Sequence, residues 1–203
     1  MTIDPQFDLL IDEITKKSAT LKTLTSNNSD EHNTPSFLIK AAREVMGGID
    51  LDPMTNKVAN TIVQASNFYI KENNGLDKEW EGKVWLNPPF SLANKAVEKL
   101  IDSYENGKVT HAVLLVKSAV DTIRYQKLYP YPFCELNGRV KFESVDNKSP
   151  APFATVLFYF GNEFYKWNEI MSQYGRVHLG SRLTTILLDS TDYYVKKALG
   201  VIR

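Results

Sequence analysis

The sequence predicts one α/β domain with a mostly parallel sheet, helices on both faces and an antiparallel hairpin. A chain of 203 residues that is 43% hydrophobic is long enough to bury a sizeable core. A predicted strand over residues 83–86 is followed by a helix and then by a continuous apolar strand over residues 112–116. This order indicates adjacent parallel strands, because parallel neighbours need a crossover connection.

Apolar periodicity and turn residues divide the first half of the chain into elements. We expect an N-terminal helix and a polar linker over residues 1–33, ahead of a main domain over residues 34–203. Thr34-Pro35 is typical of a helix N-cap and first turn, and Gly47-Gly48 of a helix end. The next predicted elements are a short buried strand ending at Asp52-Pro53, a helix (58–65), a turn (73–75) and a strand (83–86).

The second half of the chain is predicted from the same signals. An apolar helix face from Ala96 to Tyr104 ends at Gly107. Asn137-Gly138 predicts a hairpin between strands at 133–136 and 139–142. An aromatic stripe from Phe164 to Tyr174 predicts a helix whose stripe faces the core. The remaining predicted elements are a strand at 154–160, a strand at 184–188 and a helix at 190–199.

Composition excludes several functional classes. Basic and acidic residues are equal in number, 24 of each, so any nucleic-acid contact must use a local basic patch. The single Cys134 and the three histidines match no zinc-ligand spacing, so no metal is expected. The chain lacks a long apolar run and a signal-peptide layout, which predicts no membrane contact and a cytoplasmic location. It also lacks a phosphate-binding glycine loop and a nucleophile elbow, which disfavours nucleotide hydrolysis and acyl transfer.

The run 84–90 (VWLNPPF) is the most informative stretch. An apolar strand ends in Asn87, and the two prolines after it fix φ near about −65° and donate no backbone hydrogen bond. The Asn87 side-chain oxygen and the Pro88 carbonyl would thus offer two acceptors at one point, which suits the two hydrogens of a planar amino group. Phe90 adds a flat stacking surface. The structural alternative is a proline-stiffened strand end with a buried phenylalanine.

Residues 34–161 resemble the phage and prophage family of DNA adenine-amino methyltransferases, which are Dam-like, in the order and identity of their motif residues. The matching segments are Thr34-Pro35, 48–53 (GIDLDP), Ala59-Asn60, 74–76 (NGL) with Trp80, 85–90 (WLNPPF), 114–116, 121–122, 138–142 and 152–153. The resemblance implies a Rossmann-like methyltransferase fold that uses S-adenosylmethionine. It implies methylation of the adenine amino nitrogen in double-stranded DNA by a phage- or prophage-encoded enzyme. With only 203 residues, no separate target-recognition domain is expected.

The resemblance also implies roles for individual residues. The catalytic residues would be Asn87, Pro88, Pro89 and Phe90. S-adenosylmethionine would be bound by Thr34, Pro35, Ile49, Asp50, Asp52, Pro53, Gly75, Leu76 and Asn87. Asp52, and less directly Asp50, would hold the methionine ammonium or order that pocket. Simpler alternatives stay open: Asp52 as a turn residue before proline, Thr34 as a helix cap, and Asn74-Gly75 as a solvated turn.

A base inside a duplex cannot reach such a pocket, so base flipping is expected. Backbone contacts to DNA are predicted for six basic residues, although scattered lysines usually mark a solvated surface: Lys117, Arg124, Lys127, Arg139, Lys141 and Lys148. Two alternative functions remain. One is amino methylation of cytosine or of a protein glutamine, and the other is a catalytically inactive DNA-binding relative. The sequence predicts neither a recognition site nor an oligomeric state.

Overall fold

The computed structural model describes residues 34–140 and 153–189, with the backbone alone for residues 186–189. Several predictions fall outside these residues: the N-terminal helix and linker (1–33), the DNA contacts of Lys141 and Lys148, and the helix at 190–199. The main domain predicted over residues 34–203 is described only within these limits.

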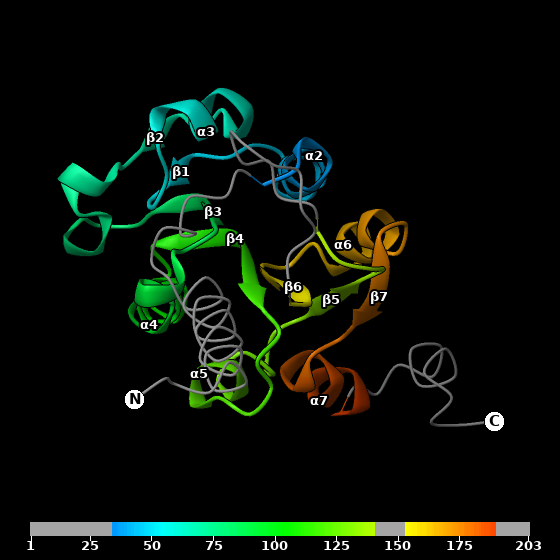
Figure 1. Cartoon of the computed structure of the whole chain (residues 1–203). Helices are drawn as coiled ribbons and strands as arrows, with labels where there is room; N and C mark the ends of the chain where they lie inside the picture. Colours follow the sequence, from blue (N-terminus) through cyan, green and yellow to red (C-terminus); the bar gives the residue numbers. More distant parts are fainter. Residues whose placement is uncertain (1–33, 141–152, 190–203) are drawn as a thin grey trace, which may run out of the picture. The chain divides into compact units, whose positions relative to one another are not determined.

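A seven-stranded mixed sheet forms the centre of the described structure, in the order β2-β1-β3-β4-β6-β5-β7 (Figure 1). The strands are β1 (Leu51–Asp52), β2 (Asn67–Phe68), β3 (Gly82–Leu86), β4 (Val109–Lys117), β5 (Phe133–Leu136), β6 (Thr155–Phe160) and β7 (Gly175–His178). β2, β1, β3 and β4 are parallel, whereas β6, β5 and β7 each pair antiparallel with the preceding strand in that order. The sheet is therefore half parallel, and not mostly parallel as predicted.

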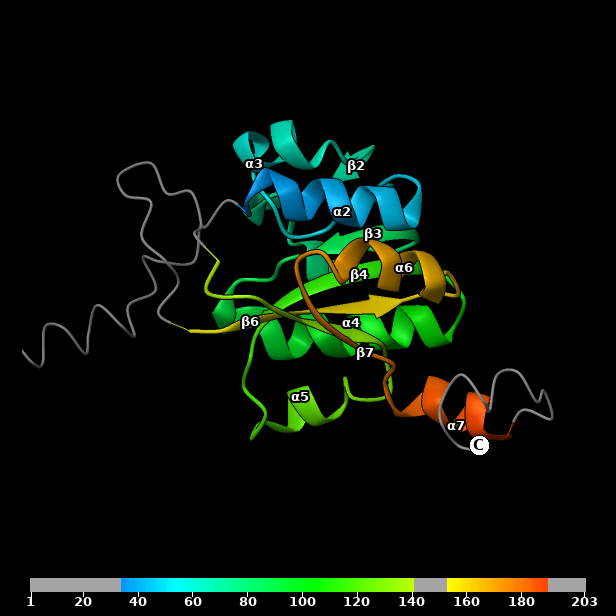
Figure 2. The ribbon, with the colours of Figure 1, turned by 90° about the vertical axis from the view of Figure 1, so that its right-hand side faces the viewer.

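Helices cover both faces of the sheet, as predicted (Figure 2). The α-helices are α2 (Ser36–Met46), α3 (Lys57–Val63), α4 (Ala93–Glu105), α5 (Ile123–Gln126), α6 (Phe164–Met171) and α7 (Ser181–Asp189). Three short 3₁₀ turns are η2 (Lys71–Asn73), η3 (Gly75–Asp77) and η4 (Phe90–Leu92). α2 and α6 lie on one face, here named the α2 face, and α4 and α5 lie on the other, the α4 face.

Two separate cores lie on the two faces of the sheet, because successive strand side chains point in opposite directions. Trp85, Val113 and Leu115 belong to the core under α2 and α6. Val84, Leu86 and Leu114 belong to the core under α4 and α5. Central strands buried on both faces explain the continuous apolar run at 112–116. The aromatic stripe of α6 also proves to be core, since Trp167 and Met171 are fully buried.

The ends of the helices follow from local sequence. Gly47, at φ 70°, takes the left-handed conformation that ends α2, and Gly48 N–H donates to the Arg43 carbonyl at 3.0 Å. At the other end, Pro35 occupies the N-cap position, and no side chain caps the helix. The prediction that Thr34 is the N-cap is therefore wrong, which leaves its hydroxyl available for another partner.

Two predicted strands are also wrong. Both edges of β5 are occupied, by β6 and by β7, so the predicted partner at 139–142 has no place beside it. Arg139 and Val140 are in no strand, and the rest of that segment lies outside the described residues. Residues 184–188 belong to α7, where the Thr184 and Thr185 hydroxyls donate to carbonyls four residues earlier, at 2.8 and 2.9 Å. These bonds give the threonine hydroxyls partners within the helix, although β-branched residues favour a strand.

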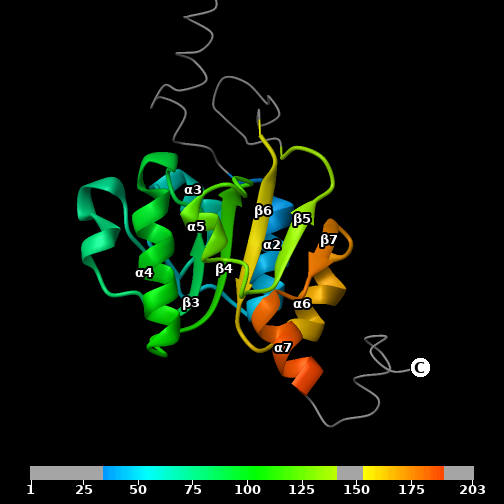
Figure 3. The ribbon, with the colours of Figure 1, turned by 90° about the horizontal axis from the view of Figure 1, so that it is seen from below.

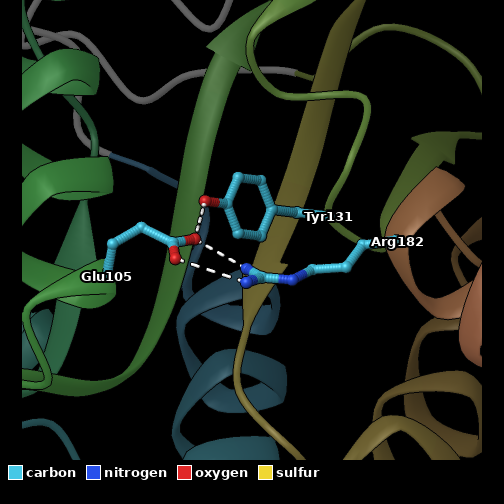
Figure 4. A network of polar contacts seen from close by, with 3 residues as sticks. All are labelled: Glu105, Tyr131 and Arg182. Carbon is cyan, nitrogen blue, oxygen red and sulfur yellow. Dashed lines mark hydrogen bonds and ion pairs between the residues drawn. The ribbon is translucent and has the colours of Figure 1, made fainter.

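β1, β3 and β4 end, and β6 begins, at the same end of the sheet, which we name the carboxyl rim (Figure 3). At the opposite end, Glu105 at the end of α4 joins two later segments (Figure 4). Its carboxylate accepts a 2.7 Å hydrogen bond from the Tyr131 hydroxyl and two from Arg182 of α7, at 2.6 and 3.3 Å. This network fastens α7 to α4 and to the segment that leads into β5.

Candidate active site

The Asn-Pro-Pro-Phe motif lies at the carboxyl rim. β3 ends at Leu86, the next three residues form an extended turn, and Phe90 opens the short turn η4 ahead of α4. Pro88 is buried, and Asn87 and Pro89 are half-buried. The strand and its prolines therefore hold the Asn87 side chain at a fixed point of the rim.

Thr34 and Asn87 meet at this point. The Asn87 amide Nδ2 donates to the Thr34 Oγ1 at 3.0 Å. Thr34 is itself 7% exposed and is one of few buried polar residues in the described chain. Because the nitrogen end of the amide faces Thr34, the Oδ1 end faces away from it and can accept a hydrogen bond.

Phe90 is part of an aromatic and cationic group at the rim. Its ring is 43% exposed and meets the Phe153 ring edge to face, with centroids 5.0 Å apart. The Lys117 Nζ lies 5.3 Å from the Phe153 ring centroid. This exposure contradicts the structural alternative, which required a buried phenylalanine. Phe153 was assigned no role from the sequence, although it lies two residues before β6, which begins at the same rim.

Asp52 ends β1, the strand beside β3, and is 3% exposed. Burial raises the pKa of its carboxyl from 3.8 to about 7, against hydrogen bonds from the Met54 backbone and the Thr55 side chain that lower it. The Met54 N–H donates to Asp52 Oδ1 at 3.3 Å, so Asp52 also acts as a turn residue before Pro53. Among the described residues, no lysine or arginine forms an ion pair with Asp52. A buried carboxyl without a cation favours a cationic ligand.

Gly75 brings a distant segment against Asp52-Pro53. A Cβ at Gly75 would lie 1.9 Å from the Pro53 carbonyl oxygen, so only glycine fits. The Gly75 carbonyl accepts a 2.8 Å hydrogen bond from the buried Trp80 indole, which fixes η3 in place. Gly75 is buried and Leu76 is half-buried, so this segment is not a wholly solvated turn. Gly75 and Pro53 are therefore in contact, and Leu76 follows Gly75 in η3; their contacts with a cofactor stay a prediction.

Ile49 and Asp50 do not join these residues. Ile49 is a buried member of the α2-face core. The Asp50 Oδ2 accepts from the Lys83 backbone N–H at 2.8 Å, at the start of β3 and thus at the end of the sheet opposite Asn87. A cavity of about 340 Å³ at that end is lined in part by Asp50, Glu79, Gly82 and Lys108. Asp50 therefore lies away from Asn87, and Ile49 packs in a core; the contacts of both residues with S-adenosylmethionine stay a prediction.

The sequence model of one protein family matches residues 21–179, and its description is DNA N-6-adenine-methyltransferase (Dam). The chain belongs to the Dam family. A comparison with curated proteins finds no match. Family membership implies a DNA methyltransferase and agrees with the suspected resemblance.

Of the basic residues predicted to contact DNA in this Dam family member, Lys117 and Arg139 are exposed. Arg124 is half-buried, and its NH1 donates to Asn94 Oδ1 of α4 at 3.0 Å. Its Nε is buried without a partner, and burial lowers the pKa of the guanidinium. Lys127 is paired with Glu98 at 2.8 Å. Lys117 lies at the end of β4 and is linked to Phe90 through the Phe153 ring.

Two further features bear on partners of the Dam family member. Within residues 34–140 and 153–189, no cluster of three or more histidine, cysteine or acidic side chains is arranged to hold a metal ion. In the same part of the chain, every helix is too short or too polar to cross a membrane.

Proposed function

We propose that this protein transfers a methyl group from S-adenosylmethionine to the amino nitrogen of adenine in DNA, on a Rossmann-like methyltransferase fold. The observation that supports this best is the Asn87 amide, whose nitrogen is bound by Thr34 and whose oxygen is left to accept beside the Pro88 carbonyl. Membership of the Dam family agrees with the reaction.

The described residues fit the proposed methyl donor. Asp52 is a buried carboxyl without a cationic partner in the described residues, so it would compensate the ammonium of the donor. Pro53, Gly75 and Leu76 would form the adjacent wall, and Thr34 and Pro35 would close the pocket near Asn87. When bound, S-adenosylmethionine supplies a methyl group already activated by its sulfonium.

The chemistry needs no strong base from the protein. The adenine amino nitrogen is a poor nucleophile because its lone pair is delocalised into the ring. The Asn87 Oδ1 and the Pro88 carbonyl would each accept a hydrogen bond from the amino group, favour a pyramidal nitrogen and stabilise the positive charge that grows during transfer. The surplus proton on the methylated nitrogen would leave to solvent after the transfer. Phe90 would stack on the base, and Phe153, edge-on to it, would support that ring.

The target base would have to leave the duplex to reach these groups. Swinging a base out costs its stacking and pairing energy, which contacts in the pocket must offset. Phe90 is exposed at the rim and free to stack, so base flipping is part of the proposal. A duplex with 2-aminopurine at the target position should become more fluorescent when the protein binds.

The experiment that tests the function is transfer of tritiated methyl into unmodified DNA, followed by nucleoside mass spectrometry. Wild type should yield N6-methyladenine, and Asn87→Ala should lose about 10²–10³ in rate. Asn87→Asp keeps a side-chain acceptor and should retain more activity than Asn87→Ala. Label in cytosine or in a protein glutamine would replace the adenine assignment. DNA binding without methyl transfer or S-adenosylmethionine binding would indicate an inactive relative.

A further inference from the structure

The turn that follows β4 exposes two aliphatic side chains. Val120 is 53% exposed and Ile123 is 79% exposed. Exposed aliphatic side chains on an ordered turn gain free energy when a partner covers them. We name this pair the apolar tip.

The backbone under the apolar tip is held firmly. The Thr122 hydroxyl donates to the Ala119 carbonyl at 2.7 Å and accepts from Tyr125 N–H at 3.3 Å, which caps α5. The Gln126 side chain donates to the Val120 carbonyl at 2.6 Å. Tyr125, two residues after Ile123 in α5, is 1% exposed and packs in the α4-face core. These contacts hold the turn in one conformation, and the side chains of the apolar tip point to solvent and do not pack in the core.

The apolar tip lies at the carboxyl rim beside the motif. The Arg124 guanidinium donates to Asn94, the second residue of α4, and α4 begins directly after Phe90–Leu92. α5 lies beside the first half of α4 (Figure 3). The exposed Lys117 precedes the turn, and Lys127, which is paired with Glu98, follows it; Asp121 lies within the turn. Cations around an exposed apolar group suit a nucleic acid, whose phosphates surround apolar base faces.

We propose that Val120 and Ile123 contact the DNA duplex at the step from which the target base is withdrawn, and replace part of the stacking that is lost there. This inference rests on the proposed function. Apolar side chains that enter a base step stabilise a distorted duplex in other proteins that deform DNA. The tip would lower the cost of base flipping without touching the methyl donor or the reacting nitrogen.

The test uses the Val120→Ser, Ile123→Ser double variant, with Tyr165→Ser as the matched control. Tyr165 is 82% exposed on α6, which follows the end of β6 and so lies at the end of the sheet opposite the carboxyl rim. Each protein is measured for duplex binding by fluorescence anisotropy and for single-turnover methylation. Two duplexes are compared: one fully paired, and one with an abasic site opposite the target adenine.

The affinity of the double variant for the paired duplex and its rate of methylation should both be about tenfold lower than those of wild type. Tyr165→Ser should match wild type in both. The abasic partner lowers the cost of withdrawing the target base, so it should recover most of the loss. Unchanged binding and rate on paired DNA, or an equal loss on both duplexes, would overturn the proposal. If wild type methylates no DNA, the proposed function fails, and the binding comparison still decides whether the tip contacts the duplex.

Discussion

Asn87 Nδ2 donates to Thr34 Oγ1 at 3.0 Å, which joins the Asn-Pro-Pro-Phe motif to a residue 53 positions earlier in the chain. The bond selects one of two orientations of the amide. We therefore regard Thr34 as the residue that positions Asn87, and the proposed chemistry depends on this orientation.

Thr34→Val keeps the shape of the side chain and removes its hydroxyl. We expect the rate of methyl transfer to fall about tenfold, because the amide can then turn its nitrogen toward the substrate, and the free energy of unfolding to fall by about 1 kcal/mol. Thr34→Ser should restore the rate. A Thr34→Val enzyme with wild-type kcat would show that Asn87 is oriented without this bond.

Asp52 makes stability depend on pH. Its folded pKa of about 7 lies above the unfolded value of 3.8, so its contribution is present below about pH 4 and is lost as pH rises through 7. The loss is on the order of 4 kcal/mol at most. Thermal melts of wild type and Asp52→Asn, compared from about pH 5 to 8, should show a steeper decline for wild type. Identical slopes would mean that the carboxyl does not titrate there.

The same carboxyl should couple binding of the methyl donor to proton release. An ammonium beside Asp52 favours the ionised form, so affinity for S-adenosylmethionine should rise as pH increases toward 7. Calorimetry in two buffers of different ionisation enthalpy should detect a proton released on binding to wild type and a smaller release for Asp52→Asn. Equal release by both proteins would place the ammonium elsewhere.

Phe90 should matter for its ring and not only for its apolar surface. Base stacking on an aromatic side chain contributes about 1–3 kcal/mol, so Phe90→Leu should lower kcat/KM on DNA about ten- to a hundredfold. Phe90→Tyr keeps the ring and should retain activity. Because the ring is 43% exposed, both variants should unfold near the wild-type temperature. Full activity of Phe90→Leu would remove the stacking role.

The Glu105–Arg182 pair should stabilise the fold modestly. Hydrogen bonds from Arg182 and then Tyr131 lower the pKa of Glu105, so this contribution is present above the usual pKa of 4.5 and is lost as pH falls through the lowered value. Both side chains are about half exposed, so Arg182→Met should cost roughly 0.5–1 kcal/mol at neutral pH. Urea unfolding of a double-mutant cycle with Glu105→Gln measures the coupling. A coupling of zero at low salt would make the pair incidental.

The sequence predicted the elements whose signals are local. Asn87 at a strand end and Gly47 at a helix end both follow from their own neighbours. It could not separate Asp50 from Asp52, because both lie in one short apolar segment and nothing local shows that β1 begins only at Leu51, after Asp50. The contacts of Gly75 with Pro53 and of Thr34 with Asn87 join segments far apart in the chain, and no local pattern encodes them.

The sheet also separates two kinds of sequence change. Leu51 and Leu86 face the α4 core, so by alternation their neighbours Asp52 and Asn87 point toward the α2 side. Thr34, which lies just before α2, binds Asn87 on that side. A cavity or a tighter fit between α4 and the sheet alters global stability and the packing of Leu76 and Trp80, but leaves the Thr34–Asn87 hydrogen bond on the other side of the sheet. The same change beneath α2 would displace Thr34 and so alter the hydrogen bond that orients Asn87. Laboratory evolution should therefore be able to change stability without changing the orientation of Asn87 on the α4 face, but not on the α2 face.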